Sequence, residues 1–117
     1  MSMIFIVDDD YQSRTNIVSL LQAEGFETKV ATNAREALVQ ILLFKPLMIL
    51  CNCYLADSSG FDLLQEVRSN QEVAHIPFIL MSNDDSDSIE RALESGADNL
   101  LQKPFNFDEI IESVTPL

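Results

Sequence analysis

The sequence predicts an α/β domain in which helices cover both faces of a doubly wound, five-stranded parallel sheet, in the order (βα)₅. Continuous apolar runs at Met3–Val7, Leu47–Cys51 and Phe78–Met81 are typical of strands buried on both faces. Helical patterns separate these runs, and such alternation requires parallel strands joined by right-handed crossovers. Glu27–Thr32 alternates and Asn99–Gln102 is short, so both suit sheet edges, and the expected strand order is 2-1-3-4-5.

Helices are expected between and after the strands, the first from about Tyr11 to Glu24. Asn33 with Glu36, and Asn106 with Glu109, have the spacing of a capping box. Gly25, Pro46 and Gly96 are expected to end the first, second and fourth helices. The apolar stripes in chain order are Ile17, Leu20 and Leu21; Ala37, Leu38, Ile41 and Leu42; Phe61, Leu64 and Val67; Ile89, Ala92 and Leu93; and Ile110, Ile111 and Val114.

Composition describes one globular domain of 117 residues, 47% of them apolar. The net charge of −12 would repel a nucleic acid, so binding of nucleic acid by this segment is not expected. The charge can serve solubility alone, or it can attract a basic partner or a cation. No apolar run is long enough to cross a bilayer, and the first residues do not form a signal peptide, so a cytoplasmic location is expected without membrane contact.

Several kinds of chemistry lack the residues that they need. Cys51 and Cys53 lie on one face of a strand, too close along the chain for an unstrained disulfide, and we expect buried free thiols. The only histidine, His75, lies in a loop away from any nucleophile. No glycine-rich phosphate loop follows a strand. We therefore do not expect an enzyme.

Polar residues follow the strands at the carboxyl edge of the predicted sheet, where open parallel sheets bind ligands. Taken singly, Asp8–Asp10 could cap a helix, Ser82 could belong to a turn and Lys103 could be a solvated surface charge. Together they bring acids, a hydroxyl and an ammonium group to one place, which indicates a site. The residues at the strand ends are Asp8, Asp9 and Asp10; Asn52; Ser82, Asn83, Asp84 and Asp85; and Lys103 with Pro104.

Four stretches resemble the receiver domain of bacterial two-component response regulators, which has a flavodoxin-like fold. "IFIVDDD" resembles the first strand with its acidic pair, Asp8 and Asp9. "KPLMILCNCYLADSSGFDLLQEVR" resembles the phospho-acceptor segment with its loop glycine, Gly60. "PFILMSND" resembles the fourth strand with its hydroxyl residue, Ser82, and "GADNLLQKPF" the run ending in Lys103 and Pro104. The resemblance covers residues 1–117, and an output domain beyond Leu117 is compatible with it.

The resemblance implies a phosphorylation switch. An Asp carboxylate takes a phosphoryl group from a histidine kinase, Mg²⁺ on the acidic pair neutralises it, and the lysine contacts it. A hydroxyl and an aromatic residue then change the face made by helix 4, strand 5 and helix 5. This sequence departs twice, because Asn52 stands at the acceptor position and Leu100 at the aromatic position.

An amide cannot form an acyl phosphate, and Asn52 removes one anionic ligand, so we expect no cofactor beyond weakly bound Mg²⁺. Two carboxylates about 5 Å apart would repel by roughly 3 kcal/mol at an effective dielectric near 20, and the amide relieves this. Two interpretations remain: a degenerate receiver acting as a phosphorylation-independent interaction module, or an ordinary receiver locked off by an engineered Asp→Asn change. Phosphotransfer to Ser82 or Asp57 is a third, weaker idea. The resemblance also implies a cis peptide bond before Pro104, with Lys103 aimed at Asp8, Asp9 and Asn52.

The expected partner is a protein, bound on the face of residues 86–95, 100–102 and 106–114, and exposed apolar residues there would support this. The helix 1 face around Ile17 to Leu21 is the competing surface. The partner can be an output domain or a second copy, and a sensor histidine kinase if the engineered interpretation holds.

Overall fold

A computed structural model describes residues 2–83 and 86–114, with only the backbone described for residues 86–89 and 114. It contains one parallel sheet of five strands in the order β2-β1-β3-β4-β5, as predicted. The strands are β1 (Met3–Val7), β2 (Glu27–Ala31), β3 (Met48–Asn52), β4 (Phe78–Ser82) and β5 (Asn99–Gln102). The helices are α1 (Tyr11–Ala23), α2 (Ala34–Phe44), α3 (Gly60–Arg68), α4 (Ser86–Glu94) and α5 (Phe107–Val114).

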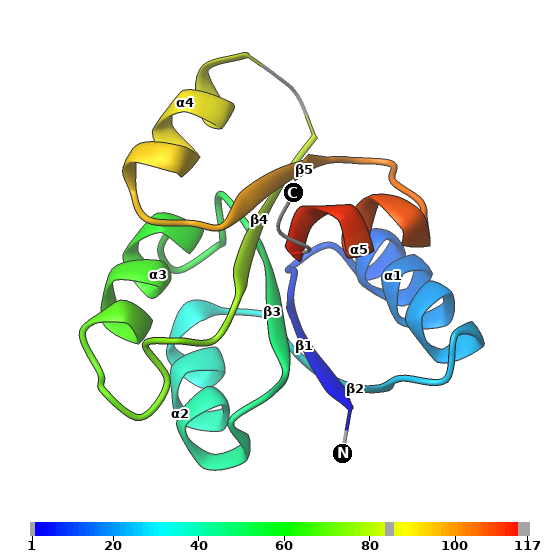
Figure 1. Cartoon of the computed structure of the whole chain (residues 1–117), viewed down its shortest axis with the longest axis horizontal. Helices are drawn as coiled ribbons and strands as arrows, with labels where there is room; N and C mark the ends of the chain where they lie inside the picture. The colour runs from blue at the N-terminus through cyan, green and yellow to red at the C-terminus, as the bar shows by residue number, and fades with distance from the viewer. Residues whose placement is uncertain (1, 84–85, 115–117) are drawn as a thin grey trace.

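Helices cover both faces of the sheet, with α1 and α5 on one side and α2, α3 and α4 on the other (Figure 1). The two sides form separate apolar clusters because side chains alternate along each strand. Phe5 and Ile49 belong to the cluster under α2, α3 and α4, whereas Ile4 and Leu50 belong to the cluster under α1 and α5. Every residue of β1, β3 and β4 is buried, which explains their continuous apolar runs.

Strand ends differ by one residue from the sequence prediction. β3 begins after Leu47, whose side chain is 52% exposed, and it includes Asn52. Asn52 pairs with Met81, and Ser82 pairs with Gln102, so polar residues continue both ladders. β2 ends at Ala31 instead of Thr32. Pairing with the neighbouring strand, which apolarity does not reveal, therefore decides where each strand stops.

The predicted helix signals hold at most positions. Asn33 accepts a hydrogen bond from the Glu36 N–H, and Asn106 and Glu109 cap each other reciprocally. Gly25 and Gly96 follow α1 and α4 with φ of 89° and 95°, a backbone conformation that glycine adopts without strain. α1 itself ends at Ala23, one residue earlier than expected.

Two members of the predicted apolar stripes do not face the core. Leu93 on α4 is 58% exposed and Ile111 on α5 is 38% exposed, whereas their neighbours Ala92 and Ile110 are buried. Leu20 on α1 is only half-buried. α4 and α5 are short, and among their described side chains the buried ones are Ala92, Ile110 and Ser113. The predicted side-chain positions of Ile89 and Val114 fall outside the described residues.

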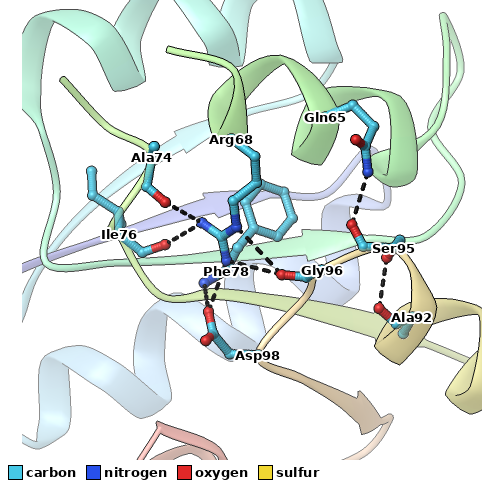
Figure 2. Close-up of polar contacts among 9 residues, drawn as sticks. All are labelled: Gln65, Arg68, Ala74, Ile76, Phe78, Ala92, Ser95, Gly96 and Asp98. Carbon is cyan, nitrogen blue, oxygen red and sulfur yellow. Dashed lines mark hydrogen bonds and ion pairs between the residues drawn. The ribbon is translucent and has the colours of Figure 1, made fainter. Parts of the chain in front are cut away.

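Arg68, at the end of α3, joins the two loops that enter β4 and β5 (Figure 2). Its guanidinium donates to the carbonyl oxygens of Ala74, Ile76 and Gly96 and forms a 2.9 Å ion pair with Asp98. Asp98 also accepts the Phe78 N–H at 2.8 Å. This network fixes the amino edge of the sheet, opposite the edge where the predicted site lies.

Candidate functional site

Asp8 is the centre of the polar cluster at the carboxyl edge of the sheet. Its side chain is fully buried and accepts hydrogen bonds from four donors. Oδ1 accepts the Asp10 N–H at 2.9 Å and Asn52 Nδ2 at 2.8 Å. Oδ2 accepts Ser13 Oγ at 2.7 Å and Lys103 Nζ at 2.9 Å. An ionised carboxylate offers about four acceptor positions, so this one is saturated.

The environment of Asp8 favours its charged form. Burial alone would raise the pKa of Asp8, but the hydrogen bonds from Lys103, Ser13 and the Asp10 N–H, with the charge of Lys103, outweigh burial and lower it. The Lys103 side chain is itself only 11% exposed. A single buried ion pair therefore neutralises the centre of the site without any added cation.

Asn52 is the last residue of β3. It lies beside Asp8 and is only 8% exposed. The amide nitrogen donates to Asp8, which leaves Oδ1 buried and without a hydrogen-bond partner in the described part of the chain. Because Asp8 can only accept, the amide must turn its NH₂ group toward it. Asn52 thus makes a contact with Asp8 that a second carboxylate could not make.

The three consecutive acids after β1 have three different surroundings. Asp8 is buried, Asp9 is exposed, and Asp10 caps α1 by accepting the Ser13 N–H at 2.8 Å. The helix-capping interpretation therefore holds for Asp10, while Asp8 belongs to the pocket. The local signal for this cap is an acid immediately before the first helical residue, where a carboxylate accepts a backbone N–H.

The other predicted positions lie on β4, on β5 and just after it. The Lys103–Pro104 peptide bond is cis, as expected, and the Lys103 ammonium points inward to Asp8. Ser82 is 8% exposed at the end of β4, and its carbonyl oxygen accepts the Lys103 N–H at 2.8 Å. Leu100 is half-buried against the cluster under α2, α3 and α4. Asp84 and Asp85 fall outside the described residues.

Two residues of this region were missed by sequence reasoning, and a third, Asp57, makes contacts that the sequence did not predict. Ser13 donates to Asp8, and the Arg14 guanidinium donates to the Asp8 carbonyl oxygen at 2.9 Å. Asp57 was considered above only as a weak phosphotransfer candidate, and its carboxylate accepts the N–H groups of Ala34 and Arg35 at the start of α2. Those amide hydrogen bonds lower the pKa of Asp57. No short-range pattern reveals a contact across more than twenty residues.

The loop after β3 is also held against α4. The Arg91 guanidinium lies 4.0 Å from the centre of the Phe61 ring and donates to the Tyr54 hydroxyl at 3.2 Å. Gly60 lies so close to the Asn52 carbonyl group that a Cβ atom there would collide with the oxygen. The loop that follows Asn52 therefore has contacts to α2, through Asp57, and to α4.

Neither cysteine supplies a reactive thiol. Cys51 and Cys53 are free and buried in the same apolar cluster, as predicted. Burial raises the pKa of Cys51 well above its usual range and that of Cys53 to about 11. Thiolate is the reactive form, so both side chains act here as apolar residues.

Mg²⁺, which the resemblance implies, fits these residues poorly. Both Asp8 oxygens already accept two hydrogen bonds each, and Lys103 balances the charge. Asp9 is exposed, and Asn52 Oδ1 is the buried oxygen that no donor satisfies within the described chain. Across residues 2–83 and 86–114, no group of three or more His, Cys, Asp or Glu side chains is placed to hold a metal ion. A divalent cation would have to displace a donor from Asp8.

Known proteins are similar to this chain in sequence. The chain is 34% identical over 116 residues to the transcriptional regulatory protein CpxR homolog of Haemophilus influenzae, covering 97% of this chain and 49% of that protein. It is 34% identical over 103 residues to the two-component response regulator ORR3 of Oryza sativa, covering 86% of this chain and 79% of that protein. The chain thus spans about half of the Haemophilus influenzae relative.

Solved structures agree with the sequence relatives. A putative response regulator from Chloroflexus aurantiacus superposes with a TM-score of 0.90 at 28% identity, covering 97% of this chain and 93% of that chain. None of the helices formed by the described residues has the length and apolarity that crossing a bilayer requires. The family described as "Response regulator receiver domain" matches residues 4–115. The chain therefore belongs to the receiver domain family of two-component response regulators.

Proposed function

We propose that this receiver domain is a protein-interaction module that works without phosphorylation and is not an enzyme. The observation that carries the proposal is the 2.8 Å hydrogen bond from Asn52 Nδ2 to Asp8 Oδ1. The resemblance assigns position 52 to the phospho-acceptor, and an amide there has no anionic oxygen with which to attack a phosphoryl group. The buried amide instead satisfies Asp8.

The electrostatics of the pocket support a stable unphosphorylated state. With Asn52, the buried side chains at its centre are the anion Asp8, the cation Lys103 and a neutral amide. An Asp in the same orientation would place an anionic oxygen where the Nδ2 donor now lies, and the pocket would then need a further cation or a proton. The charges of Asp8 and Lys103 therefore balance each other in the absence of both phosphate and Mg²⁺.

The face of α4, β5 and α5 is the proposed docking surface for a partner protein. Leu93 and Ile111 expose apolar side chains on α4 and α5. On the competing surface, Ile17 and Leu21 are buried in the core beneath α1, and this disfavours α1. Retention of a partner by Leu93→Glu tests this surface. Leu43→Glu is the comparison, because Leu43 is also exposed but lies on α2, outside the proposed face.

An ordinary receiver switched off by an engineered Asp→Asn change is the alternative, and the genomic codon for residue 52 distinguishes the two. In that case a sensor histidine kinase is also an expected partner. Phosphotransfer to Asp57 is disfavoured because its carboxylate already accepts two α2 amides. An output domain, a homodimer and a cytoplasmic location remain proposals, as does the expectation that this segment binds no nucleic acid.

Phosphorylation from a small donor tests the proposal. The protein is incubated with Mg²⁺ and acetyl phosphate, and its intact mass is measured. We expect no added phosphoryl group, whereas Asn52→Asp should restore the third carboxylate and gain one. A phosphoryl group on the unaltered sequence, mapped to any residue, would overturn the phosphorylation-independent function.

A further inference from the structure

Ser13 contacts the pocket in a way that its position in a helix does not require. Its backbone N–H is already satisfied by the Asp10 cap at 2.8 Å, and its hydroxyl donates to Asp8 Oδ2 at 2.7 Å. Hydroxyl groups within helices often donate instead to a backbone carbonyl three or four residues earlier. Thr15 and Ser113 do so here, to Gln12 and Ile110. The Ser13 hydroxyl is therefore committed to the site.

The acceptor that Ser13 uses is the one that Lys103 also uses. Oδ2 of Asp8 receives the hydroxyl and the ammonium, while Oδ1 receives the Asp10 N–H and the Asn52 amide. Of these four donors, the Asp10 N–H is fixed by the backbone and Lys103 balances the charge. A cation approaching Asp8 therefore competes directly with the Asn52 amide and the Ser13 hydroxyl. Replacing Asn52 removes only one of these two competitors.

We propose that Ser13 is a positioning residue that excludes divalent cations from Asp8, so that Asn52 is one of two side chains that keep the pocket metal-free. The inference rests on the proposed function and extends it to the regulation of metal access. It implies that Asn52→Asp alone rebuilds a weaker Mg²⁺ site than the three carboxylates would otherwise provide. Loss of the Ser13 hydroxyl should complete the site.

Calorimetric titration with Mg²⁺ tests this with a pair of isosteric substitutions. In the Asn52→Asp background, Ser13→Val removes the hydroxyl and Ser13→Thr keeps it in a side chain of the same shape. Ser13→Ala is a second hydroxyl-free variant, and it suits a helix should valine lower stability. Ser19→Ala is the control, because Ser19 is an exposed serine on the same helix. Circular dichroism before titration verifies that each variant is folded.

We expect Ser13→Val and Ser13→Ala to tighten Mg²⁺ binding about tenfold relative to Asn52→Asp alone, since a competing hydrogen bond to a charged acceptor is lost. Ser13→Thr and Ser19→Ala should leave the affinity within about twofold of that background. If the folded hydroxyl-free variants also stay within about twofold, Ser13 does not control metal access and the inference is wrong. That outcome leaves the proposed function intact, because the acetyl phosphate experiment tests it on the unaltered sequence.

Discussion

Removal of the Lys103 ammonium by Lys103→Met should destabilise the domain through Asp8. Methionine keeps an unbranched stem, so the main loss is the 2.9 Å ion pair between a fully buried carboxylate and a side chain that is only 11% exposed. Removing one partner of a buried pair costs about 3–5 kcal/mol. Asp8 retains its hydrogen bonds from Ser13, Asn52 and the Asp10 N–H, so we expect the lower end, about 3 kcal/mol.

Urea unfolding at neutral pH measures this loss. Lys45→Met is the matched control, because Lys45 forms an exposed ion pair with Glu72, and the loss there should be far smaller. Asp8→Asn combined with Lys103→Met should be more stable than Lys103→Met alone, because no unpaired charge then stays buried. A loss below about 1 kcal/mol, together with a double variant that is no more stable, would refute this electrostatic reasoning.

The pH dependence gives an independent check with a definite sign. In the unaltered protein the pKa of Asp8 is lowered, so its contribution is present above the ordinary Asp value of 3.8 and is lost as the pH falls through the folded pKa. In Lys103→Met, the hydrogen bond and charge of Lys103 no longer oppose the effect of burial, so the pKa of Asp8 should rise. The difference in unfolding free energy between the two proteins should therefore have its full value near neutral pH. It should shrink as the pH falls through the Asp8 pKa of the variant. A difference that grows with acid would contradict this.

Two further substitutions test the close approach at Gly60 and the Arg68 network by urea unfolding. Gly60→Ala should cost about 3 kcal/mol, because the new Cβ collides with the Asn52 carbonyl oxygen; a change under about 1 kcal/mol would mean that the loop moves away freely. Arg68→Ala should cost about 2–3 kcal/mol through Asp98 and three carbonyl groups. Arg68→Lys should recover less than half, since an ammonium cannot reproduce the planar fork, and full recovery would contradict the network in Figure 2.

The strands and their order were predictable because β1, β3 and β4 are buried on both faces and leave a continuous apolar signature. Caps were predictable where donor and acceptor lie three residues apart, as in Asn33 with Glu36. Strand ends were wrong by one residue at Leu47 and Asn52, since pairing with a neighbouring strand sets them. Local patterns therefore predict the strands and their order, but they do not predict the last residue of each element.

The site was only partly predictable for a similar reason. The inward position of Lys103 and the cis bond before Pro104 followed from resemblance, and the structure has both. Ser13 looked like an ordinary residue of a first helical turn, and its contact with Asp8 depends on how α1 packs against the end of β1. Asp57 reaches α2 across a gap of 23 residues in sequence. Such tertiary contacts have no periodicity for a sequence to display.

The Arg68 network also fixes one end of α4. Gln65 donates to the Ser95 carbonyl oxygen, and Arg68 donates to that of Gly96, so the turn that ends α4 is fixed to α3. A helix of nine residues is about 14 Å long. A tilt of about 10° around its fixed end would displace the opposite end, beside the carboxyl edge of the sheet, by roughly 2 Å. The Arg68 network therefore holds the end of α4 that is far from Asp8, and any tilt of the helix would displace most the end that lies nearest to the pocket.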